Sequence, residues 1–155
     1  MKNAIKLASN VLVKPFEGYH KRLADGTCIA YPDPGTGDKP WTIGWGSTGK
    51  DIVPGTIWTE EQASARLEKD LELFAIGVLN LSPEIDKEPE RRWAALISFA
   101  YNCGLGNYKI STLRRRTNAA DWENGAKEFL KWNKAAGREM PGLTRRRKAE
   151  SLLYI

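Results

Sequence analysis

The sequence has few of the residues that bind metals or build disulfide scaffolds. Its 155 residues include one histidine, His20, and two cysteines, Cys28 and Cys103. Two cysteines are too few for a disulfide-stabilised scaffold, and no group of Cys and His has the spacing of metal ligands. We therefore expect neither a metal nor a cofactor. A single bridge between Cys28 and Cys103 is an open alternative.

The sequence also lacks an apolar run long enough to cross a membrane. Apolar residues are frequent in segment 1–15, but Lys2, Lys6 and Lys14 interrupt them, and no small-residue cleavage site follows. We interpret this segment as an amphipathic helix of the folded domain. The sequence thus predicts no membrane insertion and no export signal, so we expect the protein to stay in the cytoplasm on synthesis.

Charged residues of both signs are frequent, but positive charge is concentrated in one part of the chain. Apolar residues make up 41% and charged residues 28%, as in an ordinary domain with one core. Residues 109–155, called the basic block below, hold 12 Lys and Arg against 5 Asp and Glu. Such a surface attracts polyanions, either nucleic acid or an anionic cell wall. The alternative is a solvated surface with no binding role.

The first part of the chain combines one helical pattern with strand patterns. Residues 3–14 fit a helix that ends near Pro15. Two patterns rich in β-branched and aromatic residues, 27–31 and 41–45, then flank the Pro- and Gly-rich loop 32–40. We expect these patterns to form a small hairpin.

Helical patterns follow from Thr59 onward. Residues 59–62 match a capping box at a helix start. Asp121 is a candidate cap for a later helix, and residues from Leu143 onward fit the last one. The apolar stripe of the first long helix recurs at steps of four and three: Leu67, Leu71, Phe74, Val78 and Leu81.

These patterns predict a single α+β domain over residues 1–155. A small lobe of helix plus hairpin covers about 1–58, a connecting helix about 59–80, and a larger helical lobe about 81–155. A polymer would lie in a cleft between two such lobes.

Two carboxyl groups and a hydroxyl are the candidates for chemistry. Glu17 follows the first helical pattern, Asp33 lies among prolines, and Thr42 lies on the second strand pattern. Hydrolysis of a glycosidic bond needs an acid for the leaving oxygen, and the inverting route needs a second carboxylate that activates water. Each residue alone has a plainer explanation: a helix-end ion pair, a turn or a strand former. Asp38 competes with Asp33 for the second role.

The order of these motifs resembles the phage-type lysozymes, the muramidase endolysins of glycoside hydrolase family 24. Segments 16–18, 31–33 and 41–46 are similar to the catalytic stretch of that family, and 94–104 and 142–147 to its later motifs. Two features depart from the family: loop 35–40 is extended, and a serine replaces the histidine that many members have after the last glycine.

The resemblance implies a lysozyme-like fold and a role for each matching residue. Glu17 would be the general acid, Asp33 the carboxylate that positions water, and Thr42 its helper. By the same matching, the substrate-binding positions are Asn102, Thr144 and Arg145.

The predicted function is hydrolysis of the β-1,4 bond between N-acetylmuramic acid and N-acetylglucosamine in peptidoglycan. The family implies a monomeric phage enzyme that does not bind nucleic acid and that needs a holin-type pore to reach the periplasmic wall. One alternative is a lytic transglycosylase, which needs the acid but no water-directing carboxylate. The other is a non-catalytic basic module that binds the wall or nucleic acid.

Overall fold

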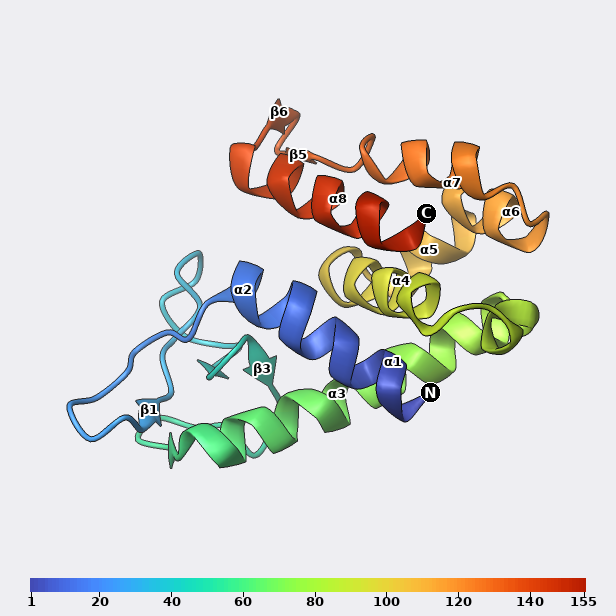
Figure 1. The fold of residues 1–155 in the computed structure, drawn as a ribbon. Coiled ribbons are helices and arrows are strands. Elements are labelled where there is room, and N and C mark those ends of the chain that lie inside the picture. Colours follow the sequence, from blue (N-terminus) through green and yellow to red (C-terminus); the bar gives the residue numbers. More distant parts are fainter. The chain divides into compact units, whose positions relative to one another are not determined.

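The computed structural model describes residues 1–155, which form two compact units (Figure 1). The helical unit consists of residues 1–12 and 71–155, and the hairpin unit of residues 13–70. The long helix α3, Glu60–Leu81, contributes residues to both. The first helix therefore packs with helices from the C-terminal half of the chain, and it contacts α4, Glu90–Cys103.

The N-terminal helix is longer than the sequence predicted. It consists of α1, Lys2–Leu7, a π-helical stretch η1, Ala8–Val13, and α2, Lys14–Glu17. The expected end near Pro15 was wrong, because this proline lies in the first turn of α2. A proline is tolerated there, since the N–H that it lacks has no partner within that turn. The change from wide π turns to α turns immediately before it lets the chain continue to Glu17.

The hairpin unit contains two short antiparallel pairs. They are β1, Cys28–Ile29, with β4, Ile57–Trp58, and β2, Thr42–Ile43, with β3, Ser47–Thr48. The predicted strands 27–31 and 41–45 are therefore shorter than expected, and they meet only at a bridge between Tyr31 and Thr42. The sequence did not reveal β3 and β4, because two residues are too few for an alternating pattern.

The start of α3 is the capping box that the sequence predicted. The Gln62 amide donates to Thr59 Oγ1 at 3.1 Å, and the Thr59 amide donates to Gln62 Oε1 at 2.9 Å. The predicted stripe faces inward, since Leu67, Leu71 and Val78 are fully buried. Reciprocal bonds at the first turn and a buried stripe along the helix together stabilise α3.

The helical unit is built around α4. Every residue from 93 to 100 is buried, and the C-terminal helix packs along α4. Phe99 lies edge-on against Tyr108, Phe129 and Trp132 with centroid distances of 6.3, 5.6 and 5.4 Å. The other elements are η2, Pro83–Lys87, α5, Leu105–Ile110, α6, Thr112–Asn118, α7, Trp122–Phe129, β5, Lys134–Ala135, β6, Arg138–Glu139, and α8, Pro141–Tyr154.

One predicted helix start is confirmed and the other is shifted. Asp121 is the N-cap residue of α7, as predicted, and its carboxylate accepts hydrogen bonds from the side chains of Arg116 and Asn124. The last helix begins at Pro141, two residues before Leu143, because proline suits the first position of a helix.

Several arginines of the basic block form contacts within the fold, whereas others, such as Arg115, Arg138 and Arg145, are exposed. Arg114 donates to the carbonyl oxygens of Leu81 and Lys109 at 3.0 and 2.9 Å. Arg116 forms an ion pair with Asp121 at 2.8 Å. These two side chains therefore hold helix ends, and binding of a polyanion by the basic block stays a prediction.

Two further arginines of the basic block are buried beside one carboxylate. Arg146 is 3% exposed, and Arg147 and Glu150 are fully buried. The Arg147 Nη2 and Arg146 Nε atoms lie 3.1 and 3.2 Å from Glu150 Oε1, which also accepts from Ser98 Oγ at 2.6 Å. Burial of these charges is possible because each guanidinium meets the carboxylate directly.

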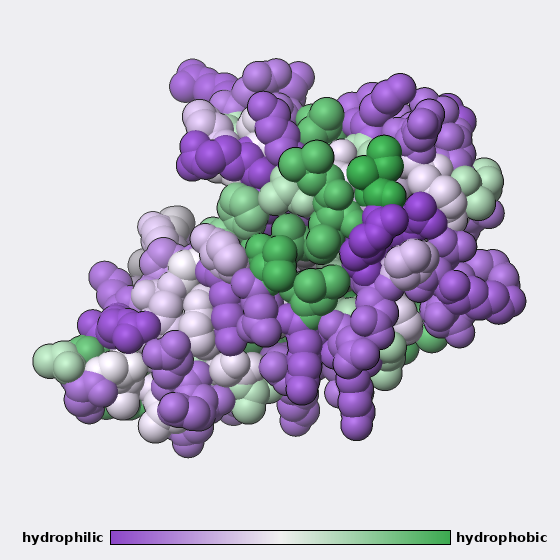
Figure 2. Space-filling model, viewed as in Figure 1, coloured by the Kyte–Doolittle hydropathy of each residue, from purple (hydrophilic) through white to green (hydrophobic).

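Figure 2 shows a mostly hydrophilic face with one apolar area near its centre. None of the helices combines the length and the apolar character needed to span a membrane. Cys28 and Cys103 are both free thiols, so the bridge between them is not formed.

Candidate active site

Glu17 is the last residue of α2, and the backbone around it is fixed. Gly18 has φ +75°, a value that ends the helix and that other residues rarely adopt. Its amide donates to the Lys14 carbonyl at 3.1 Å. A ring nitrogen of His20 lies 2.6 Å from the carbonyl oxygen of Glu17. These contacts set the direction in which the Glu17 side chain leaves the helix.

Tyr31 lies close to the end of α2. Its ring meets the His20 ring edge-on at a centroid distance of 5.9 Å. Burial raises the pKa of the Tyr31 phenol, and the negative charge of the Glu17 carboxylate raises this pKa further. His20 therefore links the end of α2 to Tyr31 through its contacts with the Glu17 carbonyl and the Tyr31 ring.

Thr42 lies on the same face as Tyr31. The two residues exchange backbone hydrogen bonds of 2.9 Å in both directions, so they are directly opposed across an antiparallel pair. Directly opposed residues direct their side chains to the same face. The side chains of Tyr31 and Thr42 are therefore neighbours on one face of the pair.

Asp33 follows Tyr31 by two residues. Both residues precede prolines, which favours an extended backbone, and alternation then directs their side chains to one face. Asp33 Oδ2 accepts from the amides of Gly35 and Thr36, each at 3.0 Å. Both bonds fall on one oxygen, so the carboxylate is oriented while its other oxygen is available to a water molecule.

Asp38 is engaged differently. It is exposed, and its Oδ1 accepts from the indole Nε1 of Trp41 at 3.1 Å. Its amide donates to Thr36 Oγ1 at 3.3 Å. Asp38 therefore holds the extended loop against Trp41, and this geometry favours Asp33 as the second carboxylate.

Asn102 lies in a cavity of the helical unit. Its Oδ1 accepts from Arg147 Nη2 at 2.9 Å, so the amide nitrogen is directed away from that arginine. The cavity has a volume of about 440 Å³. Its other lining residues are mostly polar or charged, with one thiol, one amide, two ammonium groups, one indole and one apolar side chain. They are Cys103, Asn107, Lys131, Lys134, Trp132 and Leu143.

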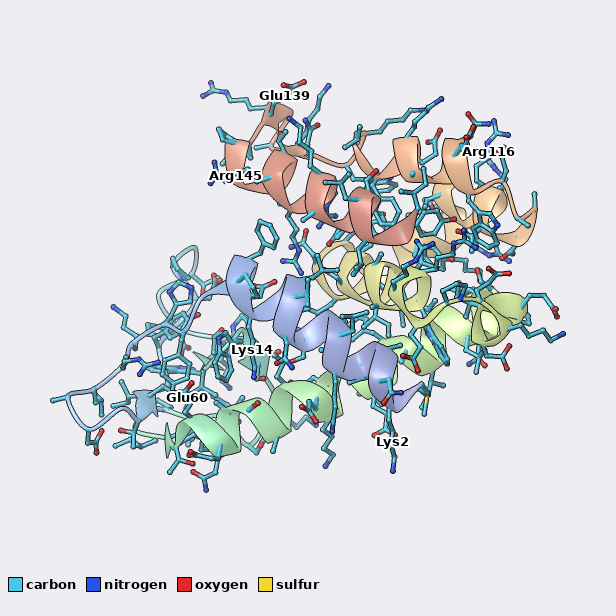
Figure 3. The ribbon with its side chains drawn as sticks, viewed as in Figure 1. Lys2, Lys14, Glu60, Arg116, Glu139 and Arg145 are labelled. Atoms are coloured by element: carbon cyan, nitrogen blue, oxygen red, sulfur yellow. The ribbon has the colours of Figure 1, made fainter.

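Thr144 and Arg145 do not line this cavity. The Thr144 hydroxyl accepts from Asn133 Nδ2 at 3.1 Å. Arg145 is exposed, is the fifth residue of α8 and lies beside the β5–β6 hairpin (Figure 3). The six predicted site residues thus form two groups: Glu17, Asp33 and Thr42 in the hairpin unit, and the other three in the helical unit.

Sequence reasoning missed two residues of the site, His20 and Tyr31. The signals were present: His20 is the only histidine and lies three residues after Glu17, and Tyr31 alternates with Asp33. What the sequence did not show is that the chain returns to bring Tyr31 opposite Thr42.

The geometry can be compared with known proteins. The family model described as phage lysozyme matches residues 15–150. The chain belongs to the phage lysozyme family. It is 40% identical over 144 residues to an endolysin of Bacillus phage B103, covering 93% of this chain and 51% of that protein. It is 40% identical over 110 residues to a SAR-endolysin of Bacteriophage PS119, covering 70% and 64%. The chain thus spans about half to two thirds of the length of these relatives.

Other similar proteins are nearly the same length. An endolysin of Acyrthosiphon pisum secondary endosymbiont phage 1 is 32% identical and is covered to 92%. The muramidase domain of SpmX from Asticaccaulis excentricus has a TM-score of 0.77 at 27% identity, with 100% of this chain and 96% of that chain covered. A mutant of P22 lysozyme has a TM-score of 0.75 at 29% identity, with 99% and 96% covered. The predicted family and the lysozyme-like α+β fold are confirmed.

Proposed function

We propose that this chain is an endolysin that hydrolyses the β-1,4 bond between N-acetylmuramic acid and N-acetylglucosamine in peptidoglycan. The observation that carries the proposal is the pairing of Tyr31 with Thr42, with an oriented Asp33 two residues after Tyr31. His20 contacts both the Glu17 carbonyl and the Tyr31 ring, which brings the end of α2 next to this pair. Membership of the phage lysozyme family and relatives named endolysin support the substrate class.

In this mechanism Glu17 is the general acid. It donates its proton to the glycosidic oxygen as the bond from that oxygen to the anomeric carbon breaks. Asp33 and Thr42 hold a water molecule on the opposite face of the sugar. The water oxygen bonds to the anomeric carbon, and its proton passes to Asp33. One water is consumed, and the configuration at the anomeric carbon is inverted.

The first test is Glu17→Gln, measured as turbidity loss of a peptidoglycan suspension. Glutamine keeps the size and hydrogen bonding of the side chain but delivers no proton, so the rate should fall at least about a hundredfold. Glu60→Gln is the matched control, because Glu60 is an exposed residue of the same unit that pairs with Arg22. Lysis by Glu17→Gln at the wild-type rate, with an unchanged circular dichroism spectrum, would reject Glu17 as the acid.

Product analysis separates hydrolysis from the transglycosylase alternative. Hydrolysis leaves a reducing sugar end, whereas a transglycosylase leaves an anhydro end. We expect reducing ends only, because Asp33 is fixed by two backbone amides in a way that suits a water-positioning carboxylate.

We further infer that the protein folds as a monomer in the host cytoplasm and reaches the periplasmic wall through a holin-type pore. The support is that its N-terminal apolar residues are committed to the core: Ala4, Ile5, Ala8 and Leu12 are buried. Expressed alone in a Gram-negative host, the protein should lyse cells only after the inner membrane is permeabilised. Spontaneous lysis that depends on the host secretion machinery would overturn this route, and relatives named SAR-endolysin make that outcome worth measuring.

A further inference from the structure

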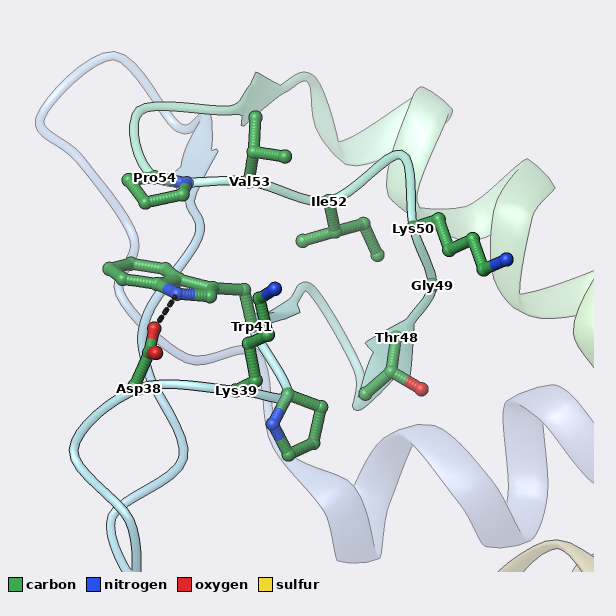
Figure 4. Close-up of a pocket in the computed structure, with 10 residues that line it drawn as sticks. Asp38, Lys39, Trp41, Thr48, Gly49, Lys50, Ile52, Val53 and Pro54 are labelled. Atoms are coloured by element: carbon green, nitrogen blue, oxygen red, sulfur yellow. Dashed lines mark hydrogen bonds between the residues drawn. The ribbon is translucent and has the colours of Figure 1, made fainter.

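A second cavity lies in the hairpin unit, and the residues assigned to catalysis do not line it. It has a volume of about 910 Å³ and lies between segment 38–41 and segment 48–54 (Figure 4). Glu17, Asp33 and Thr42 do not line it. Trp41 does, and so does Thr48, which is directly opposed to Thr42 across the β2–β3 pair, so the cavity borders the strand that carries Thr42.

Both walls of this cavity are held in place by hydrogen bonds. On one wall the Trp41 indole donates to Asp38, and Figure 4 shows the ring reaching toward Pro54. On the other wall the amide of Ile52 donates to the Gly49 carbonyl at 3.1 Å, and the amide of Val53 donates to a threonine hydroxyl at 3.1 Å. The cavity is therefore a preformed feature of the unit.

The lining combines an aromatic platform, an apolar corner and positive charge. Trp41 is half-buried, Ile52 is buried, and Val53 is 51% exposed. Lys39 and Lys50 also line the cavity, against a single carboxylate that already accepts the indole N–H. A sugar ring stacks on an indole through its apolar face, and ammonium groups pair with carboxylates.

We propose that this cavity binds a peptide-bearing N-acetylmuramoyl unit of peptidoglycan, away from the bond that is cleaved. The sugar ring stacks on Trp41, the acetyl methyl contacts Ile52 and Val53, and carboxylates of the attached peptide pair with Lys39 and Lys50. The choice of ligand rests on the proposed function, because it takes peptidoglycan as the polymer. The extended loop 35–40, which departs from the family pattern, forms part of one wall of this cavity and would therefore contribute to binding.

The test is a titration of the full chain carrying Glu17→Gln, so that the ligand is bound but not cleaved. Two ligands are compared: a soluble disaccharide-peptide from peptidoglycan, and an N-acetylglucosamine trimer, which has no carboxylate. The indole N–H signals are followed by nuclear magnetic resonance, and Trp41→Phe assigns the Trp41 signal. We expect the Trp41 signal to shift with the disaccharide-peptide while the Trp58 signal of the same unit does not.

Charge and shape variants then test the two parts of the cavity. Lys39→Ala with Lys50→Ala should raise the Kd for the disaccharide-peptide at least about fivefold, as expected for two solvent-exposed ion pairs, and leave the Kd for the trimer unchanged. Lys21→Ala with Lys69→Ala, two exposed lysines of the same unit, is the matched control. Val53→Glu changes an exposed side chain, so the fold should persist. The negative charge that it brings into the cavity should raise the Kd for the disaccharide-peptide.

The outcomes separate this inference from the proposed function. An unmoved Trp41 signal, or a Kd unaffected by both the lysine pair and Val53→Glu, overturns the cavity as a binding site even if the wild type cleaves peptidoglycan. Equal weakening for both ligands overturns the role given to the lysines. Loss of the proposed function would appear instead as a wild-type protein that binds the disaccharide-peptide at Trp41 but produces no new reducing ends.

Discussion

Tyr31 connects the predicted catalytic residues at the scale of single side chains. Burial and the negative charge of Glu17 raise the pKa of the Tyr31 phenol, and the Tyr31 backbone pairs with that of Thr42. Asp33 follows Tyr31 by two residues. The same segment separates two aspartates that the sequence left as competitors. Asp33 is oriented by backbone amides, whereas Asp38 accepts from an indole. The contacts of each carboxylate, more than its position in the sequence, favour one role over the other.

Replacing each aspartate by asparagine tests this distinction. Asp33→Asn removes the charge that accepts the proton of water, so kcat on peptidoglycan should fall about a hundredfold or more. Asp38→Asn should keep most activity, because an amide oxygen can still accept from Trp41. Initial rates and thermal midpoints of both variants provide the comparison. A larger loss for Asp38→Asn, with both proteins folded, would transfer the role to Asp38.

At the scale of elements, α3 shows how a local signal and a long-range one act together. Its start is fixed by the reciprocal bonds between Thr59 and Gln62, which involve only neighbouring residues. Its stripe of Leu67, Leu71 and Val78 is fully buried, and the Ala75 carbonyl on the same helix accepts from the Trp93 indole, which lies 18 residues further along the chain. The cap defines where the helix begins, and burial provides most of its stability.

The capping box can be tested by Thr59→Ala. This change removes the oxygen that accepts from the Gln62 amide and should lower the free energy of unfolding by about 1 kcal/mol. Thr59→Ser is the control, since serine caps at least as well and should stay near the wild type. Urea unfolding followed by circular dichroism measures both. If alanine and serine behave alike, the cap contributes little to this helix.

At the scale of the molecule, the helical unit depends on a buried ionic cluster. Glu150 lies between Arg146 and Arg147 and accepts from Ser98. Burial raises the pKa of the Glu150 carboxyl, whereas the two guanidiniums lower it. The basic block thus contributes to the interior of the protein as well as to its surface.

Glu150→Gln tests how much the cluster contributes. Glutamine has nearly the same shape but removes the carboxylate charge that Arg146 and Arg147 both contact, so the free energy of unfolding should fall by about 3–5 kcal/mol. The control is Glu139→Gln on the exposed strand β6, which should change stability by no more than about 0.5 kcal/mol. Urea denaturation of the three proteins decides the matter, and equal midpoints would show that the cluster is not needed for stability.

The sequence alone determined the parts of this protein that depend on neighbouring residues. Thr59 to Gln62 predicted the start of α3, and the stripe from Leu67 predicted its buried face. The motif order around Glu17 predicted the family and the fold. Periodicity and capping are local properties, so they are visible before the chain folds.

The tertiary structure decided what depends on distant partners. It set which two-residue segments pair with which, and it placed Tyr31 opposite Thr42. It buried Arg146 and Arg147, which no charge count predicts. The reason is physical: a short strand or a buried charge is stable only beside its partner, and that partner is brought close by the folding of the whole unit.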